Sequence, residues 1–243
     1  MLQEYYVATP VGGHATLGPR RIAKQLGLIA ALLILINIVA GVAHVLGGNR
    51  YYDLARMFIL DGENNIPTFF SSLLLLAAGL VLASIAAIKT QEADRYAPHW
   101  RALSIIFVIL AFDEMVSLHE MFNYPIRQLL GVDGVLFFGF VVLAIPLVMI
   151  LAIIYARFLI HLPSHIRRIF VLAAVLYLGG QIGVEMLSGV YFESNGSTTV
   201  AYLLITTVEE SLEFSGIILF IYGLLSYAAR NLREIRLSFE EAG

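Results

Sequence analysis

Residues 136–156 read LFFGFVVLAIPLVMILAIIYA, a run of twenty-one positions without a charged side chain. A helix needs about 20 mostly apolar residues to cross a bilayer, so this stretch predicts a transmembrane helix. Pro146 is compatible with that prediction, because neighbouring helices in a membrane satisfy the backbone groups that a proline frees. Together with similar segments on both sides of it, the stretch predicts six spans, at about 25–47, 67–88, 103–124, 135–158, 168–190 and 200–228.

The composition agrees with a membrane protein. Of 243 residues, 59% are hydrophobic and only 14% are charged, whereas about a quarter of the residues in soluble domains are charged. These values exclude a soluble globular enzyme and an intrinsically disordered chain. The chain has no cysteine, which excludes disulfides, thiolate metal sites and a catalytic thiol. A net charge of −3 argues against a nucleic-acid partner.

The sequence therefore predicts an all-α, polytopic membrane protein folded as one bundle of six transmembrane helices. Residues 25–228 form the expected membrane domain, between an N-terminal tail at 1–24 and a C-terminal tail at 229–243. The first 24 residues contain no apolar core of the kind found in a cleavable signal peptide. The first span is then expected to serve as an uncleaved anchor.

The basic residues predict how the bundle is oriented. With six spans and an N-in start, twelve of the fifteen lysines and arginines fall on the inner side and three fall outside. The three outer ones are Arg50, Arg56 and Arg127. The positive-inside rule therefore predicts that both termini are cytoplasmic. A bacterial inner (cell) membrane is the expected location.

Acidic residues are concentrated where a membrane protein should have fewest. Seven of the eighteen lie within predicted spans, and each costs about 3 kcal/mol at a helix centre if it is unpaired. We therefore expect them to face one another, water, protons or cations. They are Asp113, Glu114, Glu120, Glu185, Glu209, Glu210 and Glu213.

Helical spacing indicates how these acids converge. On an uninterrupted third span, Asp113 and Glu120 share one face, and on the sixth span Glu209 and Glu213 lie one turn apart. Glu185 lies on a polar stripe of the fifth span. The sequence therefore predicts a polar pocket between spans three, five and six, open to the outer side.

The predicted pocket contains no lysine or arginine, so the carboxyl groups must be partly protonated or must bind a cation. Carboxylates with an occasional histidine suit a divalent ion such as iron, manganese, calcium or magnesium. The Glu-x-x-His spacing of di-iron helix bundles is absent. The expected direct ligands are Asp113, Glu120, Glu209 and Glu213, with Glu114, His119, Glu185 and Glu210 as further ligands or proton-bearing neighbours.

The loop before the second span, Asp61-Gly62-Glu63-Asn64-Asn65, permits two interpretations. It is rich in oxygen ligands, but it lacks the spaced ligand set of an EF-hand. Asn65 is suited to cap the second span, and Pro67 is suited to its first turn. We favour a capped turn over a calcium loop here.

Three functions are compatible with the sequence. The first is a metal-dependent enzyme acting on a small lipid-soluble substrate, with the metal activating water or oxygen. The second is a transporter coupled to protons or to a transported cation, and the third is a non-catalytic subunit that packs against partner membrane subunits. A purely structural network of protonated carboxyl groups is also possible. The lipid bilayer is the one expected partner in every case.

Overall fold

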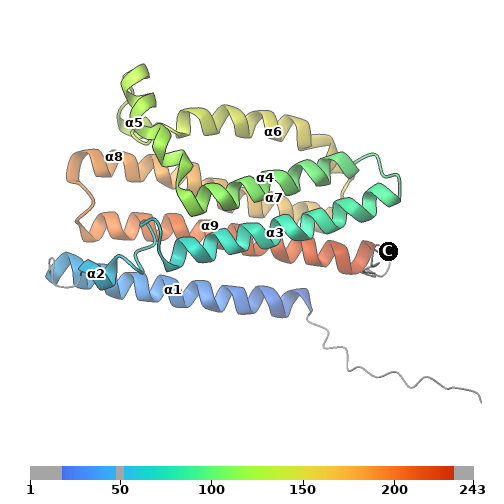
Figure 1. Cartoon of the computed structure of the whole chain (residues 1–243), viewed down its shortest axis with the longest axis horizontal. Coiled ribbons are helices and arrows are strands. Elements are labelled where there is room, and N and C mark those ends of the chain that lie inside the picture. Colours follow the sequence, from blue (N-terminus) through green and yellow to red (C-terminus); the bar gives the residue numbers. More distant parts are fainter. Residues whose placement is uncertain (1–17, 48–51, 233–243) are drawn as a thin grey trace, which may run out of the picture.

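The computed structural model describes residues 18–47 and 52–232, and the regular structure of those residues is entirely helical (Figure 1). The elements are α1 (Pro19–Gly47), α2 (Tyr52–Ala55), α3 (Ile66–Gln91), α4 (Ala97–Val116), α5 (Leu118–Leu130), a 3₁₀ turn (Gly134–Leu136), α6 (Val141–His161), α7 (Ser164–Leu178), a π-helical segment (Gly179–Val184), α8 (Glu185–Asn195) and α9 (Val200–Asn231).

Among the described residues, five continuous helical segments are long and apolar enough to cross a membrane. They are α1, α3, α6, the unbroken run Ser164–Asn195, and α9. The pair α4 and α5 is a sixth if it counts as one bent span. The prediction of an all-α protein with multiple membrane helices is therefore confirmed, while its orientation stays a prediction.

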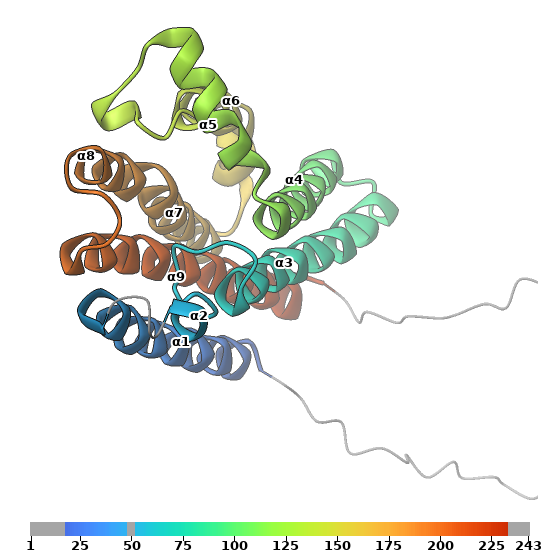
Figure 2. The same cartoon turned by 60° about the vertical axis from the view of Figure 1, so that its left-hand side comes forward.

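Helix α9 lies at the centre of the bundle and packs against α1, α3 and α7 (Figure 2). It buries residues along its whole length, from Tyr202 to Tyr227. Helix α6, in contrast, lies at the outside of the bundle and buries few residues. Its side chains are apolar on every face and most are exposed, including Ile153 at 75%. A helix that is apolar all round is suited to a lipid environment.

Helices α3 and α4 approach closely through small residues and two hydroxyl groups. The Ser72 hydroxyl donates to the Ala111 carbonyl (2.7 Å), and the Ser104 hydroxyl donates to the Gly79 carbonyl (2.8 Å). Such bonds favour helix association in lipid, where no water is available to compete for the carbonyl groups.

Asn37 joins α1 to the rest of the bundle. It is only 1% exposed, its amide donates to the Thr207 hydroxyl of α9 (2.8 Å), and its carbonyl accepts from the Leu60 amide (3.0 Å). Nearby, Gly41 packs against Leu203 so closely that no larger side chain fits there without movement.

The expected uninterrupted span at 103–124 is wrong. Helix α4 ends at Val116, Ser117 adopts a left-handed conformation (φ 55°, ψ 43°), and α5 starts at Leu118. The two helix axes differ by 78° (Figure 2). Asp113 and Glu120 therefore do not share one face of a straight helix, contrary to the prediction. The contact that joins α4 to α5 is instead the one between Asp113 and His119.

The two ends of the bundle differ in charge. We call the end with α2, α5 and the α8–α9 connection the acidic end; it lies on the left in Figure 1. The opposite end, which we call the basic end, carries Arg20, Lys89 and Arg230. There Lys89 is nearly buried and pairs with Glu92 (2.7 Å).

Candidate metal centre

The break between α4 and α5 is built around Asp113. Its Oδ1 atom accepts the backbone amide of His119 (2.9 Å), and its Oδ2 atom lies 2.8 Å from the Nδ1 atom of the same histidine. Asp113 therefore satisfies a free amide in the first turn of α5, and it fixes the imidazole ring. Both side chains are about one fifth exposed. With Nδ1 occupied by Asp113, Nε2 is the nitrogen left for a metal.

The loop before α3 is held by Asn65 and Thr68. The Asn65 side chain accepts from the Thr68 amide (3.1 Å), as predicted for a helix cap, and its own amide donates to the Ile59 carbonyl (2.7 Å). The Thr68 hydroxyl donates to the Gly62 carbonyl (2.9 Å). These bonds fix the backbone on both sides of Glu63.

Glu63 thereby meets the start of α5. One ligand atom from each of Glu63, His119 and Glu120 lies within 4.8 Å of the other two. A cation between them can bridge such a gap, because metal–ligand distances are about 2.0–2.6 Å. The Glu63 Oε2 atom is buried and has no hydrogen-bond partner among the described residues. We call Glu63, His119 and Glu120 the acidic-end triad.

Asp61 lies close to this triad. The residue reaches the surface, and its carboxyl group lies near those of Glu63, Glu120 and Glu185. Burial, reinforced by the negative charge of Glu185, raises the pKa of Asp61 to about 7, and a hydrogen bond from Tyr202 opposes this shift. The carboxyl group of Asp61 therefore lies among other acids at this end of the bundle.

Deeper in the bundle, α9 and α8 bring two carboxyl groups into contact. Glu209 is 5% exposed, and its carboxyl group lies close to that of Glu185 and interacts with it. The Glu209 Oε2 atom is buried and has no hydrogen-bond partner among the described residues. Two carboxyl groups can make such a contact only with a proton or a cation between them.

The remaining acids continue from this pair. Glu213, one turn along α9, is 6% exposed and interacts electrostatically with Glu114 and Glu185. Glu114 interacts with Ser71 of α3. Among the described residues, the ion pairs of lysine and arginine within 4.0 Å involve none of these acids.

The π-helical segment before α8 packs closely against α9 at the position of the deeper acids. A Cβ atom on Gly180 would lie 2.7 Å from the Glu209 carbonyl oxygen and 2.8 Å from the Glu213 Cγ atom. Glycine therefore lets the two helices approach closely where the acids lie. Single π-turns inside α-helices occur frequently at functional sites.

Comparison with protein families gives one match. A family model described as "Domain of unknown function (DUF8692)" matches residues 26–228. The chain belongs to the DUF8692 family. The matched DUF8692 region contains every residue of the acidic-end triad and every deeper acid. Neither the curated proteins nor the solved structures yielded a match.

Within this DUF8692 domain, the predicted residues form two connected groups. His119 and Glu120 lie at the acidic end, and Glu185 on α8 is near enough to interact with both. Glu185 also contacts Glu209, which links the triad to the deeper acids. Glu210 interacts electrostatically with Glu213 and Glu114.

Glu63 is the ligand candidate that the sequence interpretation assigned to a surface turn. The sequence showed that the loop at 61–65 around Glu63 is rich in acidic and amide side chains. Its proximity to His119 was not, because it depends on the bend at Ser117.

Proposed function

We propose that this protein binds a divalent metal ion at the acidic-end triad of Glu63, His119 and Glu120. The observation that carries the proposal is the convergence of these three side chains, together with the buried, unpartnered oxygen of Glu63. Asp113 supports it by holding His119 in the tautomer that leaves Nε2 available. A carboxylate that orients a metal-binding histidine is a common second partner in metal sites.

The donor set favours particular metals. One imidazole nitrogen and two carboxylates suit manganese, iron or zinc better than magnesium or calcium, which prefer oxygen alone. Three protein ligands leave room for water or a substrate, as in catalytic rather than structural metal sites. A metal in such a site would lower the pKa of a bound water or polarise a substrate oxygen.

We further propose that the deeper acids hold and move protons for this site. Glu185 interacts with His119 and Glu120 on one side and with Glu209 on the other, so it connects the triad to the deeper acids. These features support a metal-dependent enzyme acting on a small lipid-soluble substrate. Both termini are then cytoplasmic in our proposal, and the triad opens to the outer side of a bacterial inner membrane.

A proton- or cation-coupled transporter is the second candidate, because Glu185 and Glu209 require a proton or cation between them. Transport also needs a route to the basic end. That end holds a pocket of about 260 Å³ lined by Lys89 and Asp94, among others, but Trp100, Phe158 and Leu224 are packed there, each at most 1% exposed. The packing therefore favours a site that opens at one end. A non-catalytic subunit of a larger complex would instead carry no metal.

Elemental analysis of the purified full-length protein by inductively coupled plasma mass spectrometry tests the proposal. We expect about one transition-metal ion per chain, lost in Glu63→Gln and in His119→Gln. The control Asp53→Asn removes an exposed carboxylate near the same end and should leave the metal in place.

A double variant of two deeper acids tests where the ion binds. Glu209→Gln with Glu213→Gln should keep the metal, because these residues are outside the triad. Loss of metal only in this double variant would place the ion among the deeper acids of spans three, five and six. Absence of metal from the wild-type protein would refute the metal proposal and favour protonated carboxyl groups in a transporter or a subunit.

A further inference from the structure

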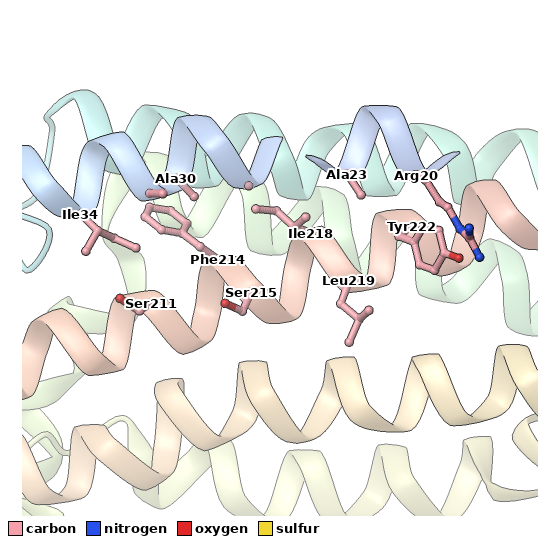
Figure 3. Close-up of a pocket in the computed structure, with 12 residues that line it drawn as sticks. Arg20, Ala23, Ala30, Ile34, Ser211, Phe214, Ser215, Ile218, Leu219 and Tyr222 are labelled. Carbon is pink, nitrogen blue, oxygen red and sulfur yellow. The ribbon is translucent and has the colours of Figure 1, made fainter. Parts of the chain in front are cut away.

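A groove runs between α1 and α9, on the side of α9 that faces away from α7 and α8 (Figure 3). Its volume is about 570 Å³, within the range of about 300–1,000 Å³ that small-molecule sites occupy. On α1 it is lined by a stripe of small side chains that includes Ala23, Gly27 and Ala30. On α9 it is lined by Phe214 and Ile218, among others.

The groove forms because α1 packs less closely against α9 along its basic half than towards the acidic end. Towards the acidic end, Asn37 is hydrogen-bonded to Thr207 and Gly41 packs on Leu203. Between Arg20 and Ile34 the small residues of α1 do not fill the space against α9. The groove is open at the surface of the bundle, where the surrounding solvent is lipid.

The groove is charged at its basic end and mostly apolar along the rest of its length, where Ser211 and Ser215 are its polar lining residues. The Arg20 guanidinium interacts with the Tyr222 hydroxyl, and Figure 3 shows the two side chains together at this end of the groove. Among the described residues, no carboxylate lies within 4.0 Å of Arg20. Arg21 and Lys24 add positive charge on the same turn of α1.

The length of the groove corresponds to one leaflet. From Arg20 to Ile34 is fourteen residues, or about 21 Å of helix. One leaflet contributes about 15 Å of hydrocarbon, half of a core about 30 Å thick, and the headgroup lies beyond it. A guanidinium group at the interface, followed by an apolar channel of leaflet depth, matches one lipid molecule with an anionic headgroup.

We propose that this groove binds one anionic phospholipid, with its phosphate at Arg20 and an acyl chain between Ala30 and Phe214. The site is separate from the acidic-end triad, because the groove is lined by α1 and α9 and by no residue of the triad. The proposal does not depend on the metal or on the orientation of the protein.

Native mass spectrometry of the full-length protein, released from micelles containing equal amounts of phosphatidylglycerol and phosphatidylcholine, tests the proposal. We expect the wild-type protein to retain one phosphatidylglycerol molecule per chain. Gly27→Phe should abolish retention, because a side chain at Gly27 meets no protein atom within 4 Å and would fill the groove. Leu28→Phe is the matched control, since Leu28 is 62% exposed and does not line the groove.

The charge is tested separately. Arg20→Gln should lower the preference for phosphatidylglycerol over phosphatidylcholine about fivefold, the contribution of one basic residue near a membrane surface. Arg21→Gln removes the same charge outside the groove and should change the preference much less. If Gly27→Phe does not fold, Ala31→Phe blocks the same groove from an exposed position.

Several results would overturn the proposal. Equal retention by Gly27→Phe and Leu28→Phe would mean that the lipid binds elsewhere. An equal loss of preference in Arg20→Gln and Arg21→Gln would indicate general surface charge. A dimer free of lipid would show that a second copy of the chain covers the groove.

Discussion

The role of Asp113 leads to a specific prediction. Replacing it by asparagine changes one side-chain group from an acceptor to a donor, and this moves the imidazole proton of His119 to the other ring nitrogen. In Asp113→Asn, the side-chain carbonyl can still accept the His119 amide, so the start of α5 is preserved. The new amide group, however, is a donor and now faces His119 Nδ1, which must become an acceptor. The ring proton then moves to Nε2, and that nitrogen can no longer bind a metal.

The size of the effect follows from this contact. The 2.8 Å bond between Asp113 and His119 is the second partner of the candidate metal ligand, and loss of such a partner typically costs 10–100-fold in metal affinity. We therefore expect the Mn²⁺ dissociation constant to rise about 10–100-fold, or about 1.4–2.8 kcal/mol. The folded structure should change little, because the backbone bond remains.

Electron paramagnetic resonance titration of free Mn²⁺ against detergent-solubilised protein measures this constant. Asp133→Asn is the matched control, since Asp133 pairs with Arg127 (3.0 Å) at the same end and its side chain is 65% exposed. Its Mn²⁺ affinity should stay within about twofold of wild type, because an exposed ion pair contributes little. Wild-type affinity in Asp113→Asn, or an equal loss in both variants, would refute the reasoning.

Three further predictions concern the scaffold. Asn37→Ala should lower the free energy of unfolding by about 2 kcal/mol, because it removes two buried hydrogen bonds; thermal unfolding in detergent against the exposed Gln128→Ala measures it, and equal midpoints would contradict it. Gly216→Ala should cost about 1–3 kcal/mol by overpacking, since its Cβ atom would lie 2.6 Å from the Tyr177 backbone nitrogen; Gly183→Ala, where nothing lies within 4 Å, should be nearly neutral in the same assay. Asn65→Ala should lower stability by about 1 kcal/mol and also weaken Mn²⁺ binding by releasing Glu63; unchanged Mn²⁺ affinity would separate the loop from the triad.

The membrane helices could be predicted from the sequence because lipid imposes a local rule. A segment without internal hydrogen bonding cannot cross a bilayer, so apolar length alone identifies a span such as the one at 136–156. The cap at Asn65 was equally local, and the structure confirms it. The concentration of acids on α9 was visible from one-turn spacing.

The features that determine the candidate site were not local. The segment around Asp113 and His119 has the pattern of a continuous helix, and nothing in it announces that Ser117 adopts a left-handed conformation. That break turns His119 back onto Asp113 and towards Glu63, which lies more than fifty residues earlier in the chain. Contacts between a loop and a bent helix depend on the packed bundle, so spacing along one helix could not reveal them.

The groove between α1 and α9 also shows the difference between features that the local sequence predicts and features that depend on the packed bundle. The small residues Ala23, Gly27 and Ala30 are evident in the sequence, and they favour close helix packing in membranes. In the structure they instead line a groove, because the tight packing of α1 on α9 lies further along, at Asn37 and Gly41. The same pattern is compatible with either outcome until the neighbouring helix is placed.

The central claim is that His119 and two glutamates bind a metal at the acidic end. Electron spin-echo measurement on the Mn²⁺-loaded protein tests it most directly, because it detects nitrogen nuclei bonded to the ion. We predict one coupled histidine nitrogen in the wild-type protein and in Glu209→Gln, and none in His119→Gln. An unchanged nitrogen signal in His119→Gln, or no nitrogen coupling in the wild-type protein, would contradict the claim.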